Sequence, residues 1–202
     1  MQPKLGPVLP TRVLLALMTL CLCAAAGVAG AVLARDDQHA PSGWEGAVRP
    51  PGMRMPEFSL TDQNGSPATD ARVRGRPAVV TFLYSTCEDT CPATTQSIRG
   101  ALDRLGRDVP VLAFSVDPAN DTPPRARAFL LEQSMTGRME FLMGTREELR
   151  PVWRAFGIAP QRDGLEHTAH TVLVDAQGRQ RIGFPSSQLT PRRLAADLAR
   201  LG

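Results

Sequence analysis

Two cysteines in the middle of the chain have the type and spacing that metal or disulfide chemistry requires. Cys87 and Cys91 enclose three residues in the stretch STCEDTCPATTQ. A thiolate pair at this spacing can bind a soft metal ion or cycle between dithiol and disulfide. A purely stabilising disulfide explains the spacing poorly, because so small a ring removes little entropy from the unfolded chain. Cys87 and Cys91 are therefore candidate metal ligands and, in the redox case, candidate catalytic residues.

The sequence around this pair predicts that both thiols lie at the carboxyl edge of a sheet, beside a helix start. Residues 78–84 (AVVTFLY) read as a buried strand, and residues 92–105 read as an amphipathic helix. Open α/β sheets bind ligands at this edge, and a helix start favours a thiolate. Glu88 and Asp89 would disfavour ionisation of the thiols by repulsion and would attract a cation, or they belong to a solvated turn.

A metal site would need at least one further ligand, and the chain has three histidines. His39 lies in a segment without periodicity, whereas His167 and His170 stand just before a predicted hairpin. The first strand of that hairpin is expected beside the strand that carries the cysteines. In an extended strand His167 and His170 would point to opposite faces, so we expect one ligand at most, and a surface loop histidine is the alternative. Two thiolates and one imidazole suit cuprous copper better than structural zinc, which takes four ligands.

The elements that must position these residues alternate between strand and helix patterns. This alternation, followed by a hairpin and a helix, predicts an α/β fold with three layers, α/β/α, around a mixed central sheet in one domain at 54–202. The further expected elements are a small hairpin at 57–66, strands at 109–117 and 138–144, helices at 122–133 and 147–156, a closing hairpin at 170–184 and a final helix at 190–201.

The N-terminal region predicts a membrane segment followed by a tether. Residues 1–34 contain a long uncharged run of roughly 33 Å as a helix, which is enough for a bilayer core. An uncleaved anchor and an export signal are both open, since residues 24–26 (Ala-Ala-Ala) resemble a cleavage pattern. Basic residues before the run, with Asp36 and Asp37 after it, predict that the domain lies outside the cytoplasm. Residues 35–53, rich in Pro, Gly and charge, predict a flexible tether.

Charge and composition exclude some partners. The chain of 202 residues has a net charge of +3 and is 43% hydrophobic, which is typical of a globular protein. The basic residues form no block and are not interleaved with aromatic residues, so we expect no nucleic-acid partner.

With these residues placed, the chain resembles the Sco/SenC family, thioredoxin-fold copper proteins that help to assemble the dinuclear copper centre of cytochrome c oxidase. The resemblance extends from Phe58 to the final helix. It includes a Cys-x-x-x-Cys-Pro motif, the segment VDPANDTP, and a histidine eleven residues before the hairpin glycine Gly178, which selects His167 rather than His170. Glu88 departs from the family, whose members commonly have proline there. The residues that carry the resemblance are Cys87, Cys91, Pro92, Asp117, Pro118, Asp121, Thr122 and His167.

The resemblance implies a membrane-anchored domain on the outer, periplasmic or extracytoplasmic, side of the cytoplasmic membrane, with copper bound by Cys87, Cys91 and His167. It implies that Asp117 and Asp121 lie near the site. The implied function is that of a copper metallochaperone that delivers copper to the copper-bearing subunit of cytochrome c oxidase, served by a copper donor and a thiol reductant.

Two other functions use the same cysteines. A thiol-disulfide reductase would keep the copper-binding cysteines of the oxidase reduced, with Cys87 attacking and Cys91 resolving. A peroxidase-like domain explains neither the close second cysteine nor the histidine. His167 separates the first two functions, because a three-ligand copper site needs its imidazole and disulfide exchange does not.

Overall fold

The computed structural model describes residues 13, 18, 21, 43–159 and 170–202. The chain divides by contacts into two compact units, Met1–Ser42 and Gly43–Gly202. Most of the expected membrane or signal segment at 1–34 lies outside the described residues. Among the residues that are described, there is no helix with the length and apolar character that a membrane span requires.

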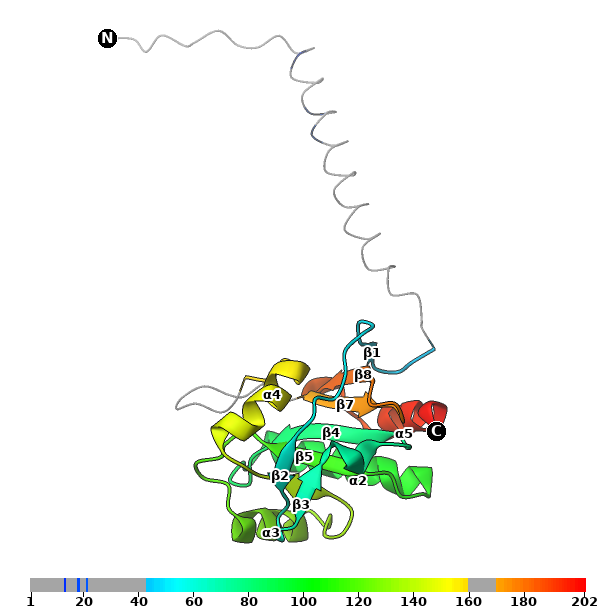
Figure 1. The fold of residues 1–202 in the computed structure, drawn as a ribbon. Coiled ribbons are helices and arrows are strands. Elements are labelled where there is room, and N and C mark those ends of the chain that lie inside the picture. The colour runs from blue at the N-terminus through cyan, green and yellow to red at the C-terminus, as the bar shows by residue number, and fades with distance from the viewer. Residues whose placement is uncertain (1–12, 14–17, 19–20, 22–42, 160–169) are drawn as a thin grey trace, which may run out of the picture. The chain divides into compact units, whose positions relative to one another are not determined.

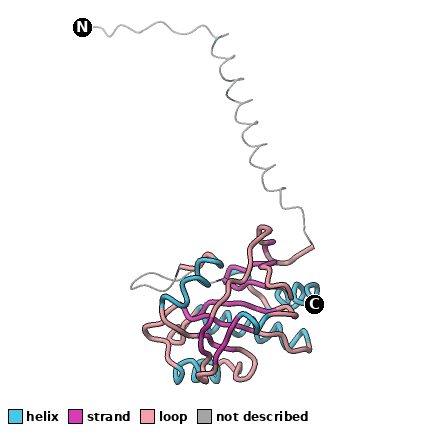
Figure 2. The backbone as a smooth tube through the Cα atoms, viewed as in Figure 1, coloured by secondary structure: helices cyan, strands magenta, loops and turns pink. Residues whose placement is uncertain are grey.

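The second unit has a six-stranded mixed sheet as its central layer, which Figure 2 shows in magenta between the helices. The strand order is β1-β8-β7-β4-β5-β6, with β4, β5 and β6 parallel to one another and the remaining pairs antiparallel. A separate two-stranded hairpin, β2 with β3, lies outside this sheet (Figure 1). The strands are β1 (Ala47–Val48), β2 (Ser59–Thr61), β3 (Pro67–Thr69), β4 (Ala78–Leu83), β5 (Val111–Ser115), β6 (Glu140–Leu142), β7 (His170–Val174) and β8 (Gln180–Pro185).

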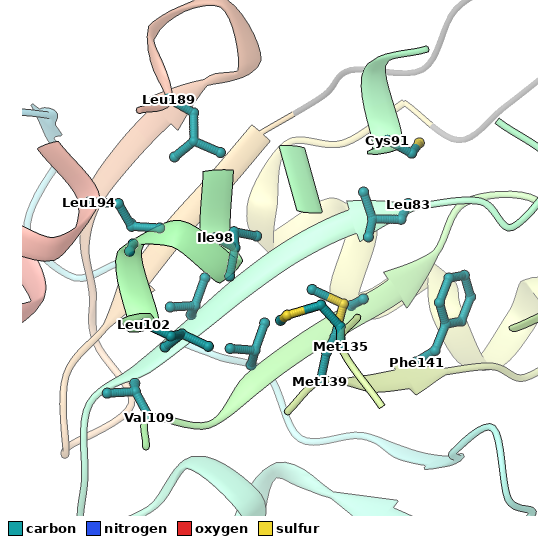
Figure 3. Packing of buried hydrophobic residues seen from close by; sticks show 14 of the residues in the cluster. Leu83, Cys91, Ile98, Leu102, Val109, Met135, Met139, Phe141, Leu189 and Leu194 are labelled. Atoms are coloured by element: carbon teal, nitrogen blue, oxygen red, sulfur yellow. The ribbon is translucent and has the colours of Figure 1, made fainter. Parts of the chain in front are cut away.

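Helices cover both faces of the sheet and give the predicted three layers. On one face α2 (Thr90–Leu105), α3 (Pro123–Glu132) and α5 (Pro191–Leu201) pack in one apolar cluster. On the other face α4 (Arg146–Phe156) packs with the β2–β3 hairpin in a second cluster. All six residues of β4 are buried, as expected for a central strand covered on both sides. Figure 3 shows Cys91 in the first cluster with Leu83 and Ile98, so that one of the two thiols belongs to the core.

The helix boundaries follow local capping signals. Thr145 and Glu148 form a reciprocal capping box at the start of α4, with the Thr145 hydroxyl accepting from the Glu148 amide. The hydroxyl of Thr190 accepts from the Arg193 amide at the start of α5. Glycine ends α2 and α4 in the left-handed region, at Gly106 with φ of 65° and Gly157 with φ of 71°. These signals explain why the observed ends lie within a few residues of the predicted ones.

The folded unit begins earlier than the expected boundary at residue 54. Residues 43–53, which we expected in the flexible tether 35–53, lie on the sheet and on α5 instead. The amides of Glu45 and Gly46 donate to the buried Asp197 carboxylate at 2.9 Å each. A side chain at Gly46 would not fit, since a Cβ there would lie 2.5 Å from Cγ2 of Ile182. So short an edge strand, fixed by distant partners, has no local periodicity.

Chain segments that precede β4 lie along β8 and just beyond β6. Along β8, β1 pairs with Gly183 and Ile182, and the segment continues past the hairpin turn, where the Met55 amide donates to the Gly178 carbonyl at 2.8 Å. Beyond β6, Thr61 and Met143 exchange two backbone hydrogen bonds of 3.0 and 2.8 Å. The Gln63 side chain accepts from the Phe141 amide of β6 at 2.8 Å.

Candidate metal and thiol site

The two central cysteines lie side by side at the carboxyl end of β4, as their spacing predicted. Cys87 is partly exposed in the loop between β4 and α2, and Cys91 is fully buried in the first turn of α2. The Cys91 amide donates to Sγ of Cys87 at 3.3 Å. Both side chains are free thiols. The first turn of α2 thus provides a backbone N–H group that donates to the Cys87 sulfur, which favours a negative charge on that sulfur.

The pKa values of the two thiols are shifted in opposite directions. A hydrogen bond from the Cys91 thiol, assisted by the amides of Cys91 and Asp89 and by the Tyr84 side chain, lowers the pKa of Cys87 to about 5, against the opposing effect of burial. The same hydrogen bond, together with burial, raises the pKa of Cys91 far above that of an ordinary thiol. Near neutral pH, Cys87 is therefore a thiolate and Cys91 a thiol. A thiolate is the form that attacks disulfides and binds metals.

The two acidic residues between the cysteines do not enclose the thiols. The side chains of Glu88 and Asp89 are both exposed to solvent. Their charges are screened by water and act weakly on the sulfurs. The expectation of a solvated turn fits this placement.

The segment after β5 contacts the cysteine loop through a buried carboxylate. Oδ1 of Asp121 accepts from the amide and the hydroxyl of Ser85 at 2.7 and 2.6 Å, and Oδ2 accepts from the Ser115 hydroxyl at 2.5 Å. Burial raises the pKa of Asp121 against these hydrogen bonds. Asp117, in contrast, accepts from the exposed Asn120 side chain at 2.8 Å. Asp121 thus reaches the loop of Cys87, in agreement with the resemblance, whereas Asp117 stays within its own turn.

Of the three histidines, the structure describes His170 alone. His39 and His167 lie outside the described residues, so His167 stays a prediction as the third ligand. His170 is the first residue of β7, and its Nδ1 is buried without a hydrogen-bond partner among the described residues. Burial, with the charge of Arg49 added, lowers the pKa of His170. Within the described ranges, the His, Cys, Asp and Glu side chains form no group of three that could hold a metal ion.

Three residues at the site were not singled out by the sequence analysis. Tyr84 follows the last residue of β4 and lowers the pKa of Cys87, while Ser85 and Ser115 donate to Asp121. The only local signal was the position of Tyr84 and Ser85 just before the Cys-x-x-x-Cys motif. Ser115 carries no such signal, because its role depends on the pairing of β4 with β5.

Comparison with known proteins identifies the family. The family model described as SCO1/SenC matches residues 48–202, which is nearly the whole folded unit. The chain belongs to the SCO1/SenC family. Protein SenC of Rhodobacter capsulatus is 36% identical over 137 residues, which are 63% of this chain and 59% of that protein. The chain thus matches about three fifths of the length of this relative.

Solved structures agree in fold. A copper-bound ScoI of Bradyrhizobium japonicum is 34% identical and superposes with a TM-score of 0.62 over 74% of this chain and 99% of that chain. A SCO1/SenC family lipoprotein from Bacillus anthracis is 24% identical, with a TM-score of 0.67 over 77% of this chain and 99% of that one. The predicted thioredoxin-like α/β fold with a mixed sheet is therefore confirmed for the folded unit.

Proposed function

We propose that this protein binds copper through Cys87, Cys91 and His167 and delivers it to the copper-bearing subunit of cytochrome c oxidase during assembly. The observation that carries the proposal is the paired sulfur arrangement, with the thiolate of Cys87 over the first turn of α2 and the Cys91 sulfur beside it. The copper bound to the similar ScoI of Bradyrhizobium japonicum supports the same metal here. A further relative in fold is described as a member of a family of cytochrome c oxidase assembly proteins.

The donor set fits a soft monovalent ion. Thiolate sulfur and imidazole nitrogen favour cuprous copper over harder ions such as magnesium or calcium. Cys87 provides a ready thiolate, whereas Cys91 must lose its proton when the metal binds, so binding releases a proton. Because Cys91 is buried and Cys87 is partly exposed, an incoming sulfur from a recipient protein would reach the Cys87 side of the site first.

Chain connectivity supports His167 as the third ligand. β7 pairs with β4 up to Thr171 opposite Thr81, so β7 begins at the edge of the sheet where β4 ends. His167 precedes the first residue of β7, His170, by three positions. A chain of three residues spans at most about 11 Å. The sequence separation from His170 therefore allows His167 to serve the edge that carries both sulfurs.

The decisive experiment compares His167→Ala with His170→Ala. The full chain, purified in detergent and reduced, would be titrated with cuprous ion against a chromophoric chelator under anaerobic conditions. We expect His167→Ala to weaken cuprous affinity by at least about tenfold, because two sulfurs alone leave the trigonal site incomplete. His170→Ala, the matched control three residues away, should bind as tightly as the unchanged protein. Equal affinity of His167→Ala and the unchanged protein would refute the ligand set.

A thiol-disulfide reductase is the second candidate, and the unequal pKa values of the two thiols favour it. The Cys87 thiolate would attack a disulfide of the oxidase subunit, forming a mixed disulfide and releasing one thiolate of that subunit. Cys91 would then lose its proton and attack Cys87, releasing the second thiolate. The products are a Cys87–Cys91 disulfide and a partner dithiol, and an external thiol reductant must restore the pair.

The same variants separate the two candidates. His167→Ala should leave the rate of disulfide exchange measurable, while Cys87→Ser abolishes it. If His167→Ala lost disulfide exchange together with copper, the two activities would share the imidazole.

The proposed location is the outer side of the cytoplasmic membrane, with the N-terminal segment as anchor or export signal. This location fits the charges around the apolar run of residues 13–34, since basic residues precede it and Asp36 and Asp37 follow it. A copper donor and a thiol reductant on that side are then required as partners.

A further inference from the structure

The carboxylate of Asp121 is buried, and both of its oxygens accept hydrogen bonds. Asp121 is neither a proposed ligand nor a helix cap. The residue is 9% exposed, and its two oxygens accept three hydrogen bonds from Ser85 and Ser115. All three donors are neutral. Burying a carboxylate is unfavourable unless good hydrogen bonds offset the loss of water, so the three hydrogen bonds are what keep this group in place.

Asp121 does not serve the helix that follows it. The N-cap of α3 is Thr122, and its side chain makes no capping hydrogen bond. The amide of Asp121 donates to the Asp117 carbonyl at 2.9 Å, which completes the turn after β5 by itself. The carboxylate is directed instead to the neighbouring loop, which begins where β4 ends.

That neighbouring loop is short and carries Cys87. The Cys87 amide donates to the Tyr84 carbonyl at 3.3 Å, so residues 84–87 form a tight turn with Ser85 inside it. Asp121 holds both the amide and the hydroxyl of Ser85, and its other oxygen binds Ser115 at the end of β5. The turn is thus fixed to the sheet on the side of β5, and the sulfur of Cys87 is held 3.3 Å from the Cys91 amide.

We propose that Asp121 is a positioning residue, which ties the turn at residues 84–87 to the end of β5 and so sets the separation of the two sulfurs. This inference rests on the proposed function, because the sulfur separation matters for copper binding. Residues that orient the groups binding a metal typically change metal affinity by about 10- to 100-fold when removed. The role is geometric, so a neutral side chain with the same hydrogen bonds should replace the aspartate.

The central test compares Asp121→Ala with Asp121→Asn in the full chain in detergent. In Asp121→Asn, Oδ1 can still accept from Ser85, and the amide nitrogen can donate to the Ser115 hydroxyl, which has a free lone pair. We expect Asp121→Ala to weaken cuprous affinity about tenfold or more, and Asp121→Asn to stay within about threefold of the unchanged protein. If Asp121→Asn binds as weakly as Asp121→Ala, charge rather than position is responsible and the proposal is wrong.

Two control variants separate positioning from loss of charge and from general destabilisation. Asp117→Ala removes the same charge from the same segment without touching Ser85, and should bind copper within about twofold of the unchanged protein. Leu149→Ala opens a cavity in the core cluster on the other face of the sheet and lowers stability without removing a hydrogen bond of Asp121. Cuprous affinity of Asp121→Ala that matches that of Leu149→Ala would overturn the proposal. Ser85→Ala, which deletes a single hydrogen bond, should weaken binding about threefold and replaces Asp121→Ala if that variant does not fold.

A readout without copper distinguishes failure of this inference from failure of the proposed function. Amide hydrogen exchange of the metal-free protein should accelerate at least about tenfold at residues 85–91 in Asp121→Ala, with the amides of β6 unchanged. If the unchanged protein binds no cuprous ion, the proposed function fails and this exchange still decides the positioning role. Unchanged exchange at residues 85–91 would refute the positioning role even if copper binds.

Discussion

Cys87 carries the negative charge of the thiol pair, and Cys91 carries the proton. The asymmetry follows from position, because Cys87 lies in the loop and receives N–H and S–H donors, while Cys91 is enclosed in the core. A low-pKa sulfur at the surface and a protonated sulfur behind it give attack and resolution a fixed order. The same order would make Cys87 the first sulfur to bind an ion and the first to be approached by a recipient.

Alkylation of Cys87 should show this asymmetry directly as a pH profile. The thiolate is the reactive form, so the rate of Cys87 with iodoacetamide should stay level from pH 8 to 6 and fall by half near pH 5, where Cys87 becomes protonated. Cys91→Ala removes the first cause of the shift and should move the midpoint upward. Mass spectrometry of the metal-free, reduced full chain would give both rates. A midpoint near that of a free thiol, about 8.5, would contradict the assignment.

The sequence was sufficient to locate both sulfurs, because a strand, a Cys-x-x-x-Cys motif and a helix start are local features. The expected order, with Cys87 attacking and Cys91 resolving, agrees with the lower pKa of Cys87, but the cause of that pKa was not predicted. The cause is the set of hydrogen bonds that Cys87 receives next to the turn at residues 84–87, and the contact of Asp121 with that turn joins residues 36 positions apart in the chain. Ser115 was missed because its contact with Asp121 and the Cys87 loop depends on the pairing of β4 with β5.

Among the elements, α5 holds the start of the folded unit, residues 43–53, through the side chain of Asp197. This carboxylate is fully buried, accepts from the amides of Glu45 and Gly46, and lies 3.7 Å from the Arg200 guanidinium. The guanidinium of Arg200 also lies over the Trp44 ring, at 5.9 Å from its centroid. A helix at the end of the chain thus holds the beginning of the folded unit.

Removing the Asp197 carboxylate should weaken the attachment of residues 43–53 to α5. We expect Asp197→Ala to lower the free energy of unfolding by about 1.5–3 kcal/mol, the range for hydrogen bonds to a charged group. Amide exchange at Glu45 and Gly46 should rise at the same time. Asp103→Ala, which removes a half-exposed ion pair with Arg138, is the matched control and should cost less than about 1 kcal/mol. Urea unfolding of both variants would check the values, and equal losses would contradict the role of Asp197.

How well the sequence predicted each element depended on the length and burial of that element. β4, β5 and the four helices α2 to α5 were expected from their apolar runs, capping residues and prolines, because these signals are contained within each segment. β1 has two residues, both exposed, and is a strand only because β8 offers it a partner. No pattern within residues 43–53 could reveal that pairing.

The folded unit as a whole requires residues 43–53, which lie far before the Cys-x-x-x-Cys motif in the chain. A fragment beginning at Gly43 keeps β1 and the contacts to Asp197, whereas a fragment beginning at Arg54 loses both. The alternation of strands and helices predicted the three layers, but the start of the unit is set by contacts between the two ends of the folded unit.

The two fragments should therefore differ in stability. We expect the fragment from Arg54 to unfold with a free energy lower by more than about 3 kcal/mol, since it loses both the hydrogen bonds to Asp197 and the pairing of β1 with β8. Urea unfolding at equal protein concentration would measure the difference. Matching midpoints for the two fragments would show that residues 43–53 add nothing to the fold.

The two edges of the sheet restrict how another protein can be recognised. The edge strand β1 has only two residues, and Thr61 and Gln63 occupy backbone groups at and just beyond β6, so neither edge offers a long row of free backbone groups. A partner protein therefore has little backbone to which it could add a strand. Selective docking then falls to side chains around the Cys87 loop, where a change in the partner's surface charge or shape would alter recognition without any change in the fold.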